Sequence, residues 1–231
     1  MTNFVFPPHP QASLAIEGTE DRFPVRRIYC VGRNYAAHAR EMGNDDRDSP
    51  FFFTKPADAV VENGSTIPFP TMTDDLHFEM ELVVAIGRDG ADISEDQALE
   101  HVFAYGTGID LTRRDMQAAA KAAKRPWDLS KGFDRSAPMS ALHPVSDLVG
   151  HPAVGRIWLK KNGVIKQDAD LAEQIWSVPE IIAHLSRAIE LKAGDVIMSR
   201  SESPDKHPHL KSGQALLIAD ETAYPALVGI L

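Results

Sequence analysis

The sequence predicts an α+β fold in which strands outnumber helices. Short alternating or apolar runs recur between turn signals, whereas only three or four segments have helical spacing. Strands and helices do not alternate regularly, so a parallel βαβ sheet is not expected. The 231 residues are enough for a substantial core. We expect an extended lead-in over residues 1–25 and one domain over 26–231.

The first half of the chain is predicted to be mostly strands. Prolines at 7, 8, 10 and 24 keep the lead-in extended. A buried strand at 27–31 turns into a helix over 35–42 that ends at Gly43. A polar loop at 44–50 follows. Further strands are expected at 51–54, 59–61 and 66–68 and around Glu79 and Glu81, before a turn at 87–90.

The second half mixes helices and strands. Ser94 opens a short helix with an acidic first turn. A strand over 102–110 is expected to end at Asp110, and an alanine-rich helix follows over 111–124. Ser177 is expected to cap a helix over 178–190. Strands are further expected near 142–146 and 155–160, in a hairpin turning at 162–163, and at 195–198 and 215–230.

Composition excludes several classes of function. A net charge of −9 without a long basic run argues against nucleic acid as a partner. Cys30 is the only cysteine, so no intrachain disulfide can form, and we interpret it as a small buried hydrophobe. The sequence lacks a signal-peptide pattern and a long apolar segment, so a cytoplasmic protein with no membrane contact is expected.

The segment around residues 77–84 carries two acids on one face of a strand. Side chains alternate along a strand, so Glu79 and Glu81 share a face with His77, opposite Phe78 and Met80. Adjacent carboxylates repel each other unless a cation lies between them, and oxygen ligands suit Mg²⁺, Mn²⁺ or Ca²⁺. A solvated acidic face remains the alternative.

Other residues could complete such a site. Asp110 could be a third ligand or could cap the following helix. His38 and Glu41 stand three apart on the predicted helix, which suits either a water-activating base or a surface pair. His77 is expected beside the ligands rather than among them. Candidate anion-binding side chains are Arg33, Arg113, Arg114 and Lys131.

Five segments in order resemble motifs of the fumarylacetoacetate hydrolase family. They are residues 27–38, 53–56, the Glu79/Glu81 strand, 108–117 and 131–134. The resemblance extends from about residue 26 nearly to the C-terminus. Within the family, the lead-in to residue 27 and the loop at 125–128 are most similar to bacterial fumarylpyruvate hydrolases of the gentisate pathway, which degrades aromatic compounds. One departure lies at residues 199–209, where relatives have a glycine-rich turn, and it leaves the substrate open.

The resemblance implies a mixed β-sandwich roll, a homodimer and one Mg²⁺ or Mn²⁺ ion, with Ca²⁺ as a possible substitute in vitro. It implies cleavage of a carbon–carbon bond in a 2,4-dioxo acid, with fumarylpyruvate as the leading candidate. Another acylpyruvate, oxaloacetate decarboxylation and non-catalytic binding of metal or oxo acid remain alternatives. By motif position the metal ligands are Glu79, Glu81 and Asp110, the catalytic residues are His38, Glu41 and Lys131, and the substrate-binding residues are Arg33, Lys55, Gln117 and Ser201.

Overall fold

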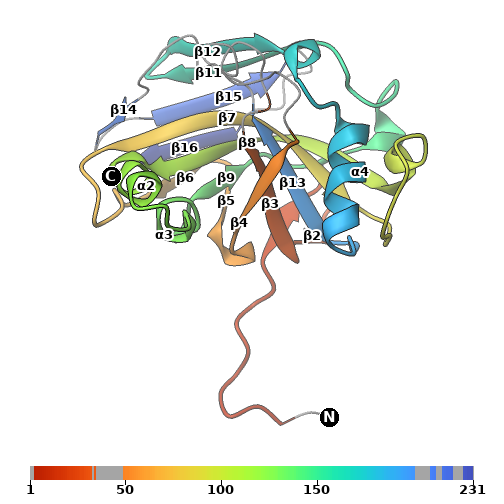
Figure 1. Ribbon diagram of the computed structural model, residues 1–231, viewed down its shortest axis with the longest axis horizontal. Coiled ribbons are helices and arrows are strands. Elements are labelled where there is room, and N and C mark those ends of the chain that lie inside the picture. Colours follow the sequence, from red (N-terminus) through yellow and green to blue (C-terminus); the bar gives the residue numbers. More distant parts are fainter. Residues whose placement is uncertain are drawn as a thin grey trace.

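Two large sheets make up most of the fold (Figure 1). The computed structural model describes residues 3–32, 34, 49–200, 209–211, 215–220 and 226–230. A five-stranded sheet lies over one face of a nine-stranded sheet, and a small hairpin of β1 (Ser13–Ala15) and β2 (Arg22–Pro24) lies near the opposite end. This architecture confirms the predicted α+β class, mostly β.

The nine-stranded sheet runs β4-β3-β13-β7-β8-β9-β5, with β10 beside β8 and β14 beside β7. Its strands are β3 (Arg27–Gly32), β4 (Phe51–Lys55), β5 (Val60–Glu62), β7 (Leu76–Ile86), β8 (Val102–Arg113), β9 (Ala137–Met139), β10 (His143–Pro144), β13 (Asp195–Arg200) and β14 (His209–Leu210). The five-stranded sheet runs β12-β11-β15-β16-β6, comprising β6 (Ser65–Ile67), β11 (Arg156–Lys161), β12 (Val164–Asp170), β15 (Ala215–Asp220) and β16 (Ala226–Ile230).

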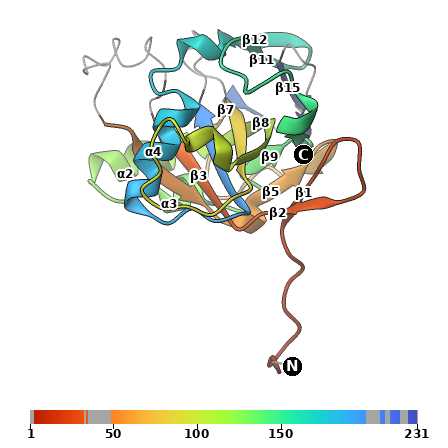
Figure 2. The ribbon, with the colours of Figure 1, turned by 90° about the vertical axis from the view of Figure 1, so that its right-hand side faces the viewer.

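Helices are short and lie at the margins of the sheets (Figures 1 and 2). The α-helices are α2 (Arg114–Ala122), α3 (Asp128–Lys131) and α4 (Val178–Ala188). Single 3₁₀ turns are η1 (Ala57–Ala59), η2 (Ala98–His101), η3 (Val145–Asp147) and η4 (Leu171–Glu173). In the described part of the chain, no helix has the length and apolar character to cross a bilayer.

Strand β7 is buried along its whole length because both of its faces are covered. Alternation sends Phe78 and Met80 into the large core that includes Ile157 of the five-stranded sheet. The opposite face carries Val83, which packs in a second core with Met198. The glutamates of β7 belong to this second face, so the acidic side chains are held inside the protein and not in solvent.

Several predicted elements form as expected. Asn162 and Gly163 have φ values of 50° and 81°, as a tight hairpin turn between β11 and β12 requires. Ser177 and Glu180 form a capping box at the start of α4, which confirms the predicted helix start. That helix ends at Ala188, two residues before its predicted end.

The structure corrects the predicted boundary at Asp110. Strand β8 continues to Arg113, and α2 therefore covers nine residues and not the whole of 111–124. Leu111 pairs with Phe78, and Thr112 pairs with His77, in the long ladder between β7 and β8. These pairings outweigh the local helical preference of the sequence. Asp110 consequently lies inside a strand and does not cap a helix.

Three shorter predictions also need correction. The segment expected as a strand at 142–146 has only two strand residues before η3, and the helix expected from Ser94 is the single turn η2. Residues 13–24 of the expected lead-in pair as the β1–β2 hairpin, and its Leu14 and Phe23 are buried in the second core. The predicted helix over 35–42 lies outside the described residues.

Asp195 joins the two parallel strands β13 and β3. Its buried carboxylate accepts from Arg27 Nε at 2.9 Å and Nη2 at 2.6 Å, and from Arg26 Nη1 at 3.2 Å. The hydrogen bonds to Asp195 raise the pKa of Arg27, which stays charged.

Asp195→Ala should lower the free energy of unfolding by about 3 kcal/mol, because two arginines lose a buried counter-charge. Urea denaturation measures this loss of stability. The control is Asp89→Ala, which breaks the exposed ion pair with Lys192. An Asp195→Ala protein that loses no more stability than Asp89→Ala would contradict the prediction.

Candidate metal centre and active site

Three carboxylates meet where β7 and β8 pair. Glu79 lies directly opposite Asp110, and Glu81 is two residues further along the same face, opposite Gly108. Each side chain offers an oxygen, and the three oxygens all lie within 4.8 Å of one another. Glu79 is 2%, Glu81 1% and Asp110 0% exposed. The predicted alternative of a solvated acidic face is therefore wrong.

Lys131 provides a positive charge at this carboxylate cluster (Glu79, Glu81 and Asp110). Its Nζ lies 2.9 Å from Glu79 Oε2, contacts Asp110 Oδ2 and donates to Thr112 Oγ1 at 2.7 Å. Burial alone would lower the pKa of Lys131, but the charges of Asp110 and Glu79 outweigh it and the pKa is raised. The amine is therefore held as an ammonium group against two of the three acids.

Lys55 supplies a second cation from the end of β4. Its Nζ lies 2.8 Å from Asp110 Oδ1, donates to Leu111 O at 3.1 Å and also donates to the carbonyl oxygen of Lys131. An ammonium group has three donors, and all three of these contacts are protein oxygens. The substrate-binding role that the family resemblance gives to Lys55 stays a prediction; the structure places its ammonium group against Asp110 and the carbonyl oxygen of Lys131.

Arg114, at the start of α2, reaches back over β7. Its Nη2 lies 2.5 Å from Glu79 Oε1, and its Nε donates to His77 Nδ1 at 3.2 Å. His77 Nε2 lies 2.8 Å from Asp75 Oδ1, which fits a proton on Nε2. Arg114 also donates to Gln117 Oε1, one helical turn further on. His77 thus lies beside the acids as an outer partner, as the sequence predicts.

The donor set of the cluster fits a hard divalent cation. Three buried oxygens converge from two strands, and no nitrogen or sulfur ligand is among them. Lys55, Lys131 and Arg114 bring three positive charges to the three acids, so the cluster is close to neutral by itself. A divalent ion bound there would give the site a net charge of about +2, which favours an anionic ligand.

Cys30 lies on the same sheet face, in β3. It is fully buried, and burial raises its pKa, with the negative charges of Glu81 and Asp110 adding to the effect. The thiol is therefore kept protonated, which agrees with the interpretation of Cys30 as a packed hydrophobe and not a nucleophile.

Four of the predicted site residues lie outside the part of the chain described. They are Arg33, His38, Glu41 and Ser201. Asn34, which is described, fixes the chain just after β3. Its Nδ2 donates to Trp176 O at 2.9 Å and to Ser199 Oγ at 2.8 Å, and its Oδ1 accepts from Trp176 N at 2.7 Å.

Two members of the site, Thr112 and Arg114, have a position that the sequence does not predict. Thr112 received no role, although it lies two residues from Asp110 and therefore shares its face. Arg114 was a candidate anion binder, but its pairing with Glu79 depends on where α2 begins. The spacing of Arg114 and Gln117 at i and i+3 was the available signal.

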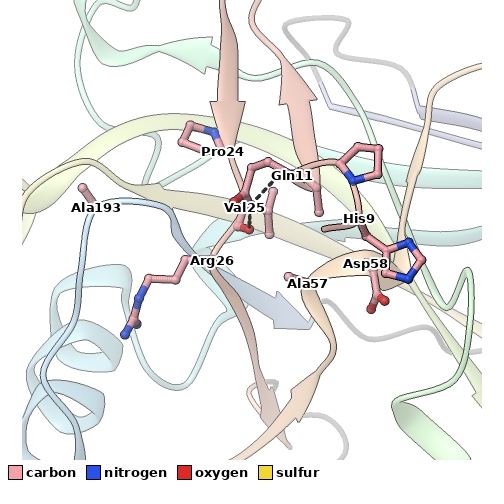
Figure 3. Close-up of a pocket in the computed structure, with 10 residues that line it drawn as sticks. His9, Gln11, Pro24, Val25, Arg26, Ala57, Asp58 and Ala193 are labelled. Carbon is pink, nitrogen blue, oxygen red and sulfur yellow. Dashed lines mark hydrogen bonds between the residues drawn. The ribbon is translucent and has the colours of Figure 1, made fainter. Parts of the chain in front are cut away.

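A groove of about 500 Å³ opens elsewhere, beside the base of the N-terminal segment (Figure 3). Its wall includes His9, Arg26 and Asp58, and Gln11 Nε2 donates to Val25 O at 2.7 Å across it. None of its lining residues belongs to the carboxylate cluster. The groove is therefore separate from the candidate metal centre.

Residues 27–217 match the family profile described as fumarylacetoacetate (FAA) hydrolase C-terminal. The chain belongs to the fumarylacetoacetate hydrolase family. This confirms the resemblance seen in the five sequence motifs, and the matched range contains every described member of the carboxylate cluster.

Solved and curated members of the family to which this chain is similar carry three different activities in their names. A fumarylpyruvate hydrolase from Pseudomonas aeruginosa, crystallised with Mn²⁺ and pyruvate, is 45% identical, with 99% of each chain covered and a TM-score of 0.92. A mitochondrial oxaloacetate tautomerase from Arabidopsis thaliana is 38% identical over 82% of this chain and 84% of its own. A mitochondrial oxaloacetate decarboxylase from Dictyostelium discoideum is 38% identical over 77% of this chain and 82% of its own.

Proposed function

We propose that this family member is a metal-dependent hydrolase that cleaves fumarylpyruvate to fumarate and pyruvate. The observation that carries the proposal is the buried carboxylate cluster with Lys131 against it. It occurs in a chain that is similar along its whole length to a fumarylpyruvate hydrolase with bound Mn²⁺ and pyruvate. A dioxo acid has a carboxylate and an adjacent 2-oxo oxygen, which together suit such a centre.

Glu79, Glu81 and Asp110 would hold one Mg²⁺ or Mn²⁺ ion through their oxygens. When bound, the ion would polarise the 2-oxo group of a chelating substrate and offset its negative charge. Arg114 and Lys55 orient two of these acids through Glu79 Oε1 and Asp110 Oδ1. Such outer contacts keep ligand oxygens in a fixed direction.

The remaining chemistry is assigned to protein side chains. His38, paired with Glu41, would take a proton from the attacking water, as their motif position in the family suggests. The water attacks the carbonyl carbon of the acyl arm, and the carbon–carbon bond to the pyruvate unit breaks. Lys131 would stabilise the negative charge that develops on the departing enolate, since its ammonium is already positioned by Thr112.

Residues at the pocket margin receive lesser roles in the proposal. Arg33 and Ser201 would contact the substrate from the segments that follow β3 and β13. Gln117 is buried and is oriented by Arg114. It would present its amide NH₂ group to a substrate oxygen.

The test is an absorbance assay on the purified chain with fumarylpyruvate, maleylpyruvate, acetylpyruvate and oxaloacetate, each with Mn²⁺ and with EDTA. We expect fumarylpyruvate to be consumed fastest, with equal amounts of fumarate and pyruvate formed. EDTA should reduce the rate at least about 1,000-fold, because it removes several kcal/mol of charge stabilisation. Turnover that is unchanged by EDTA, or none with any substrate, would reject the proposal.

The second candidate is decarboxylation or tautomerisation of oxaloacetate. It is favoured by the curated relatives that are 38% identical to this chain. Neither reaction requires an attacking water, whereas both use the same electron-withdrawing centre. Product analysis separates the possibilities, since hydrolysis of fumarylpyruvate releases no CO₂. If oxaloacetate has the highest kcat/KM of the four substrates, the second candidate replaces the first.

The cellular setting is also part of the proposal. We infer that residues 26–231 act as one catalytic unit in a homodimer, in the cytoplasm, within the breakdown of aromatic compounds. The support is the resemblance to bacterial fumarylpyruvate hydrolases. Size-exclusion chromatography with light scattering would return about 51 kDa for the dimer, twice the 25.4 kDa of one chain.

A further inference from the structure

Three aromatic rings pack together at one end of the candidate site. We call Phe51 and Phe53 of β4 and Trp127 at the start of α3 the aromatic cluster. The Phe51 and Trp127 ring centroids lie 5.3 Å apart in an edge-to-face arrangement, and Phe53 lies 6.2 Å from Trp127. All three side chains are half-buried, so part of each ring surface stays accessible. The proposed reaction gives these rings no role.

The aromatic cluster adjoins the carboxylate cluster directly. Alternation along β4 puts Phe51 and Phe53 on the face from which Lys55 reaches Asp110. The Phe53 ring centroid lies 4.9 Å from Lys131 Nζ. The carbonyl oxygen of Trp127 accepts from Lys131 N at 3.0 Å, so the indole and the ammonium belong to one helical turn. Lys131 therefore contacts both the aromatic cluster and the carboxylate cluster, so the two lie next to each other.

Gly32 makes room for one of the rings. A Cβ placed on Gly32 would lie 2.0 Å from Phe51 Cζ, so the ring lies over the end of β3. On the outer side, Lys121 Nζ lies 6.0 Å from the Trp127 ring centroid. Two ammonium groups therefore flank the aromatic cluster. Lys131 Nζ lies beside the Phe53 ring, next to the carboxylate cluster, and Lys121 Nζ lies beside the Trp127 ring on the outer side.

We propose that the aromatic cluster is the wall that receives the acyl arm of the substrate and selects long conjugated arms over short ones. The inference rests on the proposed hydrolase function. A flat conjugated arm can lie against ring faces, and the second cation suits an arm that ends in a carboxylate. An acetyl arm is too short to use this surface, and the short carboxylate end of oxaloacetate gains little from apolar rings.

The test compares kcat/KM for fumarylpyruvate and acetylpyruvate, with Mn²⁺ saturating, in the unaltered chain, Trp127→Leu and Phe51→Leu. In both variants we expect the ratio of the two values to fall about tenfold or more, the usual range for lost apolar contacts. Acetylpyruvate hydrolysis should stay within about twofold. The matched control is Trp158→Leu on β11, whose half-buried indole also faces a lysine, Lys160, at 4.6 Å.

The outcomes separate the two proposals. If the ratio of kcat/KM for fumarylpyruvate and acetylpyruvate is unchanged in both variants and acylpyruvates are still hydrolysed, the proposed role of the aromatic cluster is wrong. The proposed hydrolase function is then unaffected. Equal losses on both substrates also overturn the proposed role of the aromatic cluster, because they indicate that the ring only positions Lys131. No turnover of either substrate by the unaltered chain overturns the function itself. Circular dichroism of each variant verifies folding, and Phe51→Leu decides the question if Trp127→Leu misfolds, because Phe51 lies outside α3.

Discussion

Glu81→Gln should strongly reduce metal-dependent turnover while leaving the fold intact. The substitution keeps the size of the side chain but removes the negative charge from one of three converging oxygens. We expect Mn²⁺ affinity to fall by at least about 100-fold, the upper range for changes to outer partners of a metal site. We expect kcat/KM for fumarylpyruvate to fall by about 1,000-fold. Isothermal titration with Mn²⁺ and the absorbance assay measure the two effects.

Glu95→Gln is the matched control for this experiment. Glu95 is exposed near η2, and its substitution changes the net charge by the same amount without touching the cluster. Its Mn²⁺ affinity and activity should equal those of the unaltered chain. If Glu81→Gln bound Mn²⁺ as tightly as Glu95→Gln does, Glu81 would not be a metal ligand.

Lys131→Met should lower both stability and catalysis, and a bound metal should restore only stability. Without metal, the variant leaves Glu79 and Asp110 without their shared ammonium, which should cost about 3–5 kcal/mol of unfolding free energy. Saturating Mn²⁺ supplies positive charge to the same acids, so the stability deficit should shrink. Turnover should remain about 100- to 1,000-fold low, because the enolate charge still lacks its donor.

Urea denaturation with and without Mn²⁺ tests the stability part, and Lys124→Met serves as the control. Lys124 is exposed just beyond α2 and makes no contact with the acids in the described structure. A Lys131→Met protein that is equally destabilised with and without Mn²⁺ would show that Lys131 acts on packing and not on the charge of the cluster.

The candidate metal ligands could be predicted because their pattern is local. Alternation along one strand puts Glu79 and Glu81 on a common face whatever the strand pairs with. Asp110 could be added only through motif order, since its position alone favours a helix cap. Asp110 lies beside Glu79 because of the β7–β8 ladder, which continues three residues past the predicted end of the strand. That pairing is a tertiary effect, and helix propensity gives no sign of it.

The charges around the acids could not be predicted in the same way. Lys55, Lys131 and Arg114 come from three different elements, and their convergence depends on how α2 and α3 pack against the sheet. The family resemblance assigns Lys55 to the substrate, and nothing local in the sequence shows that its ammonium group lies against Asp110 and two backbone carbonyl oxygens. The aromatic cluster likewise forms by tertiary contact, between β4 and a loop more than 70 residues away in the sequence.

The pairing of Glu79 with Asp110 also bears on how the chain folds. The two residues lie 31 positions apart, and they meet only if β7 and β8 align in the observed register. A slip by a single residue would turn Asp110 to the opposite face, into the large core. A divalent ion present during folding would therefore favour the correctly aligned strand pair. Metal availability would then influence the yield of native protein as well as the rate of the finished enzyme.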